Sequence, residues 1–164
     1  MALQSKLLLY AAIVGLLGLM GVIFWYGNLD APEIEQVEIE ITDVKVFSVN
    51  KVASTAKLAV TFLVKNPSDT TLTVSLIDYQ LYADGESLGS GQYSTVDVAM
   101  PGRAIFSSGA EIPLKNTFEL EKSEINDEIY QKVLDDGINS FKAEGSIHTE
   151  SAWSSNEKKF DSST

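Results

Sequence analysis

The sequence of 164 residues holds few side chains that could do chemistry, and they do not converge on a reaction. It has no cysteine, which excludes disulfides, thiol catalysis and thiolate metal sites. Its one histidine, His148, lies on a predicted strand between Glu144 and Glu150. A catalytic base needs a nucleophile or a substrate pocket within reach, and the sequence supplies neither. We interpret His148 as a strand residue that faces solvent or bonds to a neighbour.

Acidic and glycine-rich runs are the other candidates for binding chemistry. Residues 126–128 and the pair Asp135-Asp136 offer oxygens, but a calcium loop needs ligands at tight alternating spacing and a conformational glycine. The run from Gly85 to Gly91 lacks the following helix and the Lys-Ser/Thr of a phosphate-binding loop. The sequence therefore predicts no enzyme, no catalytic residue, no metal, no cofactor and no small-molecule substrate.

The charge balance excludes one class of partner. The chain carries 12 basic and 23 acidic residues, for a net charge of -11 and a pI near 4.4. From Gly27 onward there are 11 basic and 23 acidic residues, a net charge of -12. A field of this sign repels polyanions, so we predict no nucleic-acid partner.

The N-terminal segment predicts a membrane anchor. Residues Leu7 to Tyr26 contain no charge, and 20 helical residues at 1.5 Å each span about 30 Å, the thickness of a bilayer core. Lys6 precedes the segment and acidic residues follow it. The positive-inside rule then places residues 1–6 in the cytoplasm, a transmembrane helix at 7–26, a linker at 27–33 and the remainder outside the cell membrane.

Two points about this segment stay open in the sequence. A cleaved signal peptide is the rival interpretation, although its apolar region would be shorter and Pro32 makes cleavage after Ala31 unfavourable. Small residues at Ala11, Gly15 and Gly18 share one helix face. They form either a possible contact stripe for another membrane helix or the ordinary glycine content of membrane helices.

Most of the remaining chain alternates apolar and polar residues, as half-buried strands do. Asp84-Gly85 is a hairpin signal between two such runs. The predicted strands lie at about 37–46, 56–64, 72–83, 88–100, 105–114, 141–147 and 153–160.

One helix interrupts the strands, because Ile125, Ile129 and Val133 recur every four residues before Gly137. Ser123 or Asn126 is its predicted cap. The pattern predicts a mainly β domain at 34–160, with a frayed tail at 161–164. We expect an antiparallel immunoglobulin/fibronectin-III-like β-sandwich of about seven strands with one α-helix, preceded by the single transmembrane helix.

Four motifs in order resemble those of a known family. They are Val64-Lys65-Asn66-Pro67, Tyr79-Gln80-Leu81-Tyr82, the turn from Gly85 to Gly91, and Ile112-Pro113. Residues 37–149 resemble the type 2 late embryogenesis abundant proteins, whose module is also called the water stress and hypersensitive response domain. The family-motif residues Asn66, Pro67, Gly85, Gly91 and Pro113 are structural in this interpretation.

The resemblance implies a folded sandwich with one helix, an association with desiccation or other stress, and a membrane-anchored prokaryotic, archaeal member. The family has no established catalytic residues. Two hypotheses follow. The first is a non-enzymatic, membrane-anchored stress-protection domain that acts outside the cytoplasm through an acidic hydrated surface. The alternative is an accessory or interaction subunit of a membrane or cell-surface complex, with a membrane-protein partner.

The topology can be tested directly. A tag placed after Thr164 should be cleaved by protease added to intact cells, because Lys6 keeps the N-terminus inside. A tag that stays protected until the membrane is broken would show the opposite orientation.

Overall fold

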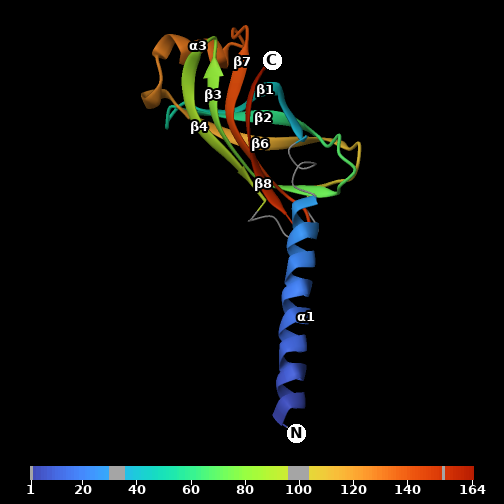
Figure 1. Cartoon of the computed structure of the whole chain (residues 1–164). Helices are drawn as coiled ribbons and strands as arrows, with labels where there is room; N and C mark the ends of the chain where they lie inside the picture. The colour runs from blue at the N-terminus through green and yellow to red at the C-terminus, as the bar shows by residue number, and fades with distance from the viewer. Residues whose placement is uncertain (1, 30–35, 96–103, 153) are drawn as a thin grey trace.

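A computed structural model describes residues 2–29, 36–95, 104–152 and 154–164 (Figure 1). A long helix, α1 (Ala2–Leu29), stands apart from a body of strands. The strands form two antiparallel sheets, which confirms the mainly β prediction. The body contains β1 (Glu38–Asn50), β2 (Thr55–Lys65), β3 (Leu72–Ala83), β4 (Glu86–Ser94), β5 (Ile105–Phe106), β6 (Glu111–Glu121), a 3-10 turn (Lys122–Glu124), α3 (Asp127–Leu134), β7 (Phe141–Glu150) and β8 (Ser155–Ser163).

The two sheets pack face to face. One has the order β1-β2-β6, and the other has the order β4-β3-β7-β8 with β5 paired to the start of β3. The alternating residues of β2 and β3 point between the sheets, so Leu58, Val60, Phe62 and Leu81 are fully buried. The alternating apolar residues of the sequence therefore form a single core between the two sheets.

Side chains join the sheets where their edges approach. The Ile41 amide of β1 donates to the Ser162 hydroxyl of β8 at 3.0 Å, and the Lys158 ammonium donates to the Val37 carbonyl at 2.7 Å. On the opposite side, the Asn116 amide of β6 donates to the Gln92 carbonyl of β4 at 2.9 Å. These bonds satisfy edge groups that a free strand would present to other chains.

The structure changes two of the predicted strands. The run at 105–114 is two strands, because Gly109 with φ +71° and the bond from the Ala110 amide to the Ser107 carbonyl form a turn. Residues 161–163, predicted as a frayed tail, continue β8, where they pair with residues 142–144 of β7. The predicted strand at 88–100 is described only as far as β4, and residues 96–103 lie outside the described part of the chain.

The helix α3 begins at its predicted cap. The Asn126 side chain accepts a hydrogen bond from the Glu128 amide at 2.9 Å, and Ile129, Tyr130 and Val133 are buried. Asp136, with φ +56°, takes the left-handed position after the helix, whereas Gly137 donates its amide to the Lys132 carbonyl. The amphipathic pattern thus predicts this element correctly, and only its stop differs by one residue.

The helix α1 covers the segment predicted to span the membrane. Within the part of the chain that the structure describes, no helix has both the length and the apolar character needed to cross a membrane. The side chains of Leu7, Leu8 and Tyr26, at the ends of the predicted span, lie outside the described residues. Between these ends, the large apolar side chains from Leu9 to Trp25 are exposed, and they include Leu17, Ile23 and Phe24.

Burial of Phe62 gives a stability prediction. The chain from Ala31 onward should be soluble, monomeric and β-rich, and Phe62→Ala should lower its free energy of unfolding by about 3–5 kcal/mol in urea titrations. Phe62 is fully buried and meets Tyr79 edge-on, with ring centroids 4.9 Å apart.

Phe47→Ala is the matched control, because Phe47 is 58% exposed and its loss should change stability by less than about 0.5 kcal/mol. Equal effects of the two substitutions, or a disordered far-UV spectrum for the parent chain, would contradict the described core.

Candidate functional site

A row of four residues crosses the larger sheet and contains two glycines. Gly91 of β4 pairs with Tyr79 of β3, which pairs with Gly145 of β7, which pairs with Phe160 of β8. A Cβ on Gly145 would lie 1.9 Å from the Asp78 carbonyl oxygen, so only glycine allows β3 and β7 to approach this closely. A Cβ on Gly91 would lie 2.4 Å from the Tyr79 ring, which covers this glycine on the core side.

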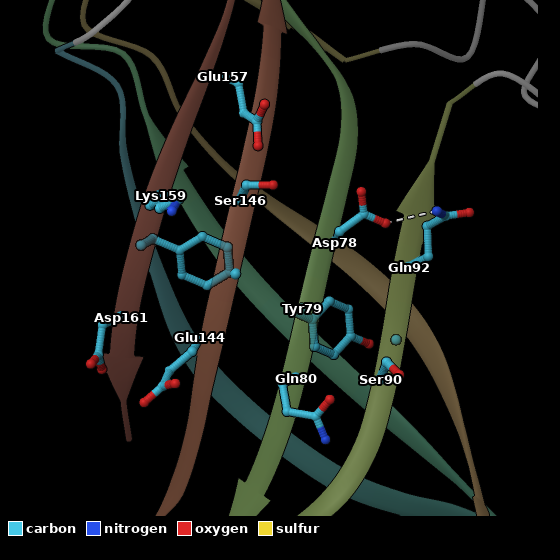
Figure 2. Close-up of a pocket in the computed structure, with 13 residues that line it drawn as sticks. Asp78, Tyr79, Gln80, Ser90, Gln92, Glu144, Ser146, Glu157, Lys159 and Asp161 are labelled. Atoms are coloured by element: carbon cyan, nitrogen blue, oxygen red, sulfur yellow. Dashed lines mark hydrogen bonds between the residues drawn. The ribbon is translucent and has the colours of Figure 1, made fainter.

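The outer face of the same sheet is hollowed at this row. The hollow has a volume of about 860 Å³, and we call it the sheet hollow (Figure 2). The glycine row forms its floor, and polar side chains from the rows on either side form its walls. Figure 2 shows these wall residues, which are Asp78, Gln80, Ser90, Gln92, Glu144, Ser146, Glu157, Lys159 and Asp161.

The charges of the sheet hollow are predominantly acidic, and several are already paired. Lys142, beside the hollow, contacts Glu144 and lies 3.0 Å from Asp161. The hydrogen bonds that the Lys142 ammonium donates to Glu144 and then to Asp161 raise the pKa of Lys142 to about 12. The Gln92 amide donates to Asp78 at 2.7 Å. Several polar side chains of the walls are thus bonded to one another or to Lys142.

Tyr79 links this face to the core. Its ring packs between Phe62 and Phe118, with centroids 4.9 and 6.3 Å away, and it is 3% exposed. Its hydroxyl oxygen accepts a hydrogen bond from the Asn116 amide at 2.9 Å. Burial raises the pKa of Tyr79 to about 12, and the bond from Asn116 opposes part of this rise. Tyr79 is therefore a neutral structural residue at physiological pH.

Asn66 has the structural role that the sequence predicts. Its side-chain amide donates to the Thr70 carbonyl at 2.8 Å and the Phe106 carbonyl at 3.0 Å. Its side-chain oxygen accepts from the Ser68 hydroxyl at 2.7 Å. Asn66 is 1% exposed, so these bonds satisfy a buried polar group while fixing the turn after β2 against the segment before β6.

The other family-motif residues occupy turns and an edge. Asp84 and Gly85, with φ of +48° and +87°, form the predicted hairpin between β3 and β4. Pro67 is exposed in the Asn66 turn. Pro113 lies on β6, the edge strand of its sheet, and pairs with Leu63 of β2. A missing amide hydrogen is tolerated on an edge strand.

The residues that the sequence offered as candidates for catalysis or metal binding do not form a common site. The His148 imidazole lies 3.9 Å from the Glu157 carboxylate, which is a carboxylate partner and not a nucleophile. Asp127 pairs with Lys122, and Glu128 pairs with Lys132 one turn along α3. In the described ranges, no three His, Cys, Asp or Glu side chains form a group that could hold a metal ion.

The sequence predicted one surface feature, the small-residue stripe on α1, and missed another, the sheet hollow. The stripe at Ala11, Gly15 and Gly18 is exposed on α1, and a Cβ on either glycine would meet nothing within 4 Å, so contact with another helix stays a prediction. The sheet hollow was not predicted. Its signal was a glycine inside two strands, Gly91 and Gly145, which marks close backbone approach.

Comparisons with known proteins give a fold and no family. No family model matches the chain, and no curated protein matches it. The solution structure of AT1g01470 from Arabidopsis thaliana is 14% identical, with 77% of this chain and 78% of that chain covered and a TM-score of 0.51. This likeness shows that the two chains share a fold.

Two other solved structures are less alike. A protein from Archaeoglobus fulgidus is 13% identical, with 76% of this chain and 94% of that chain covered and a TM-score of 0.47. A proposed late embryogenesis abundant protein, At2g46140.1, is 12% identical, with 92% and 83% covered and a TM-score of 0.40.

Because Tyr79 is buried and neutral, we expect the free energy of unfolding to fall at alkaline pH. Its folded-state pKa, about 12, lies above the ordinary value of 10, so its contribution is complete below pH 10 and is lost as pH rises toward 12. Two pKa units correspond to about 3 kcal/mol. Tyr79→Phe should remove this part of the decline in unfolding free energy, measured by urea titration between pH 9 and 12.

Tyr93→Phe is the matched control, because burial also raises the pKa of Tyr93 but this side chain is only partly buried. Parallel declines in the parent and the Tyr79→Phe variant would contradict the neutral, buried state of Tyr79.

Proposed function

We propose that this protein is a non-enzymatic stress-protection domain that acts through an acidic, hydrated surface. One observation carries the proposal. Among the described residues, every buried polar side chain is uncharged, namely Asn66, Ser68, Thr95 and Thr149, so the carboxylates all retain contact with solvent. Charged groups bind water strongly, and a surface with a large net negative charge resists association between molecules. The resemblance of the Asn66-Pro67 and Gly85–Gly91 motifs to the water-stress family supports the stress role.

We further propose that α1 anchors this domain in the cell membrane, with the N-terminus cytoplasmic and the domain outside. The support is the uncharged sequence from Leu7 to Tyr26 and the exposure of apolar side chains between Leu9 and Trp25. The lipid bilayer is then the first partner of the chain. The charge difference between Lys6 and the acidic residues after the segment supports the orientation.

The second candidate function is a docking subunit of a membrane or cell-surface complex. The sheet hollow favours it, because a depression of about 860 Å³ lined by exposed or half-buried amides and carboxylates could receive a polar segment of another protein. We also propose the immunoglobulin/fibronectin-III type for the sandwich. The orders β1-β2-β6 and β4-β3-β7-β8 support it, since they correspond to strands A-B-E and C′-C-F-G.

Drying and rehydration of a model enzyme separates the two functions. If protection comes from distributed charge, then His148→Ala or the pair Asp135→Asn and Asp136→Asn should leave the recovered enzyme activity almost unchanged. Each removes little of a net charge near -12. Neutralising many exposed acids together should reduce the recovered activity progressively.

An inert acidic protein of similar size is the control in this assay. Protection no better than this control would remove the support for the stress role. A stoichiometric partner captured from detergent-solubilised membranes, and lost on substitution within the sheet hollow, would then favour the docking subunit.

A further inference from the structure

The hairpin between β1 and β2 presents apolar side chains to solvent. We call residues 47–53 the hairpin tip. Phe47 is 58% exposed, Val49 is 42% exposed and Val52, at the apex, is 99% exposed. A register shift between Val46 and Ser48 leaves Phe47 without a partner on β2. Apolar side chains this exposed on a small domain mark a surface for association.

The conformation of the hairpin tip is held by its own hydrogen bonds. The Asn50 side-chain oxygen accepts from the amides of Val52 and Ala53, both at 3.1 Å. This closes the turn and leaves the Val52 side chain projecting from a convex apex. The apex therefore suits insertion into a soft surface more than reception of a side chain from another protein.

The hairpin tip lies in the one long basic segment of an acidic domain. Between Asp43 and Asp69 the only charged residues are Lys45, Lys51, Lys57 and Lys65. Lys45 pairs with Asp43 and Lys65 pairs with Glu40. Within the described part of the chain, Lys51 and Lys57 have no ion pair.

The surroundings of these lysines limit the basic surface to the apex. Glu119 and Glu121 of β6 lie opposite Lys57 and Thr55 of β2, so the β6 side of the sheet is acidic again. The exposed chain as a whole carries a net charge of -12. An anionic surface would therefore repel most faces of the domain and attract the hairpin tip.

We propose that the hairpin tip docks on the surface of an anionic bilayer, with Phe47 and Val52 among the headgroups and Lys51 and Lys57 near the phosphates. Apolar side chains beside lysines are the usual composition of such contacts. This docking rests on the proposed anchoring of α1, because the contact is small and is weak on its own. The tether raises the effective concentration of the tip at the membrane, so a weak contact suffices.

A single fluorescent label tests the docking in the full chain. The chain has no cysteine, so Val52→Cys provides a unique thiol for the environment-sensitive probe NBD. In nanodiscs that contain phosphatidylglycerol, the NBD emission should shift to the blue and be quenched by doxyl-labelled lipid. Both effects should be much smaller in discs of phosphatidylcholine alone.

The matched control is the same label at Glu86→Cys, the exposed first residue of β4, where neither effect is expected. Adding Lys51→Gln and Lys57→Gln to the Val52→Cys chain should lower the ratio of docked to undocked tip by about thirtyfold. Adding Lys115→Gln and Lys132→Gln removes the same charge from exposed sites elsewhere and should leave that ratio unchanged.

Three results would overturn the docking. If the chain stays in the discs but the label at residue 52 behaves as the label at residue 86 does, the tip does not dock, although the anchoring stands. If the label is shielded whatever the lipid charge, or without lipid, a protein or a second copy covers the tip. If the chain is not retained by the discs, the anchoring fails and the docking fails with it.

Discussion

The close packing of Tyr79 between two glycines is the constraint on which the body of strands depends. Gly145 allows the backbones of β3 and β7 to approach, and Gly91 leaves room for the Tyr79 ring on the core side. The ring then reaches Phe62 of the facing sheet, and its hydroxyl reaches Asn116 of β6. On the outer face this row presents only backbone, because its side chains point to the core, and it forms the floor of the sheet hollow. One local feature thus sets both the packing of the core and the shape of the exterior.

Buried or bridging polar side chains form hydrogen bonds with backbone groups that the strands of the two sheets leave unpaired. Asn66 fixes the turn after β2, and Asn116 joins β6 to β4. Ser162 satisfies a backbone group of β1, and Lys158 satisfies the backbone carbonyl of the residue before β1. Each of these side chains is uncharged or keeps its charge near solvent. The carboxylates therefore lie on the outside of the domain, where they remain in contact with solvent and incur no desolvation penalty. The acidic exterior and the apolar interior are two consequences of this separation.

The surface has two regions with different properties, and they serve different proposed roles. The sheet hollow is polar, acidic and partly paired through Lys142. The hairpin tip is apolar and basic, with Val52 at its apex. In a domain tethered through α1, the acidic regions would hold water and the tip would face the lipid.

The sequence by itself determined the mainly β class, the hairpin at Asp84-Gly85 and the cap of α3 at Asn126, because each follows from local alternation or local hydrogen bonding. It also predicted the structural role of Asn66, although not its partners at Phe106 and Thr70. Only the tertiary structure decided that residues 161–163 belong to β8, since this depends on β7 lying alongside. It also decided that residues 105–114 divide into two strands, which pair with β3 and β2 on either side of the Gly109 turn. The sheet hollow was likewise not predicted, although a glycine inside each of two strands is a signal of close backbone approach. Gly91 and Gly145 are 54 residues apart, and only the pairing of β4, β3 and β7 places them on either side of Tyr79.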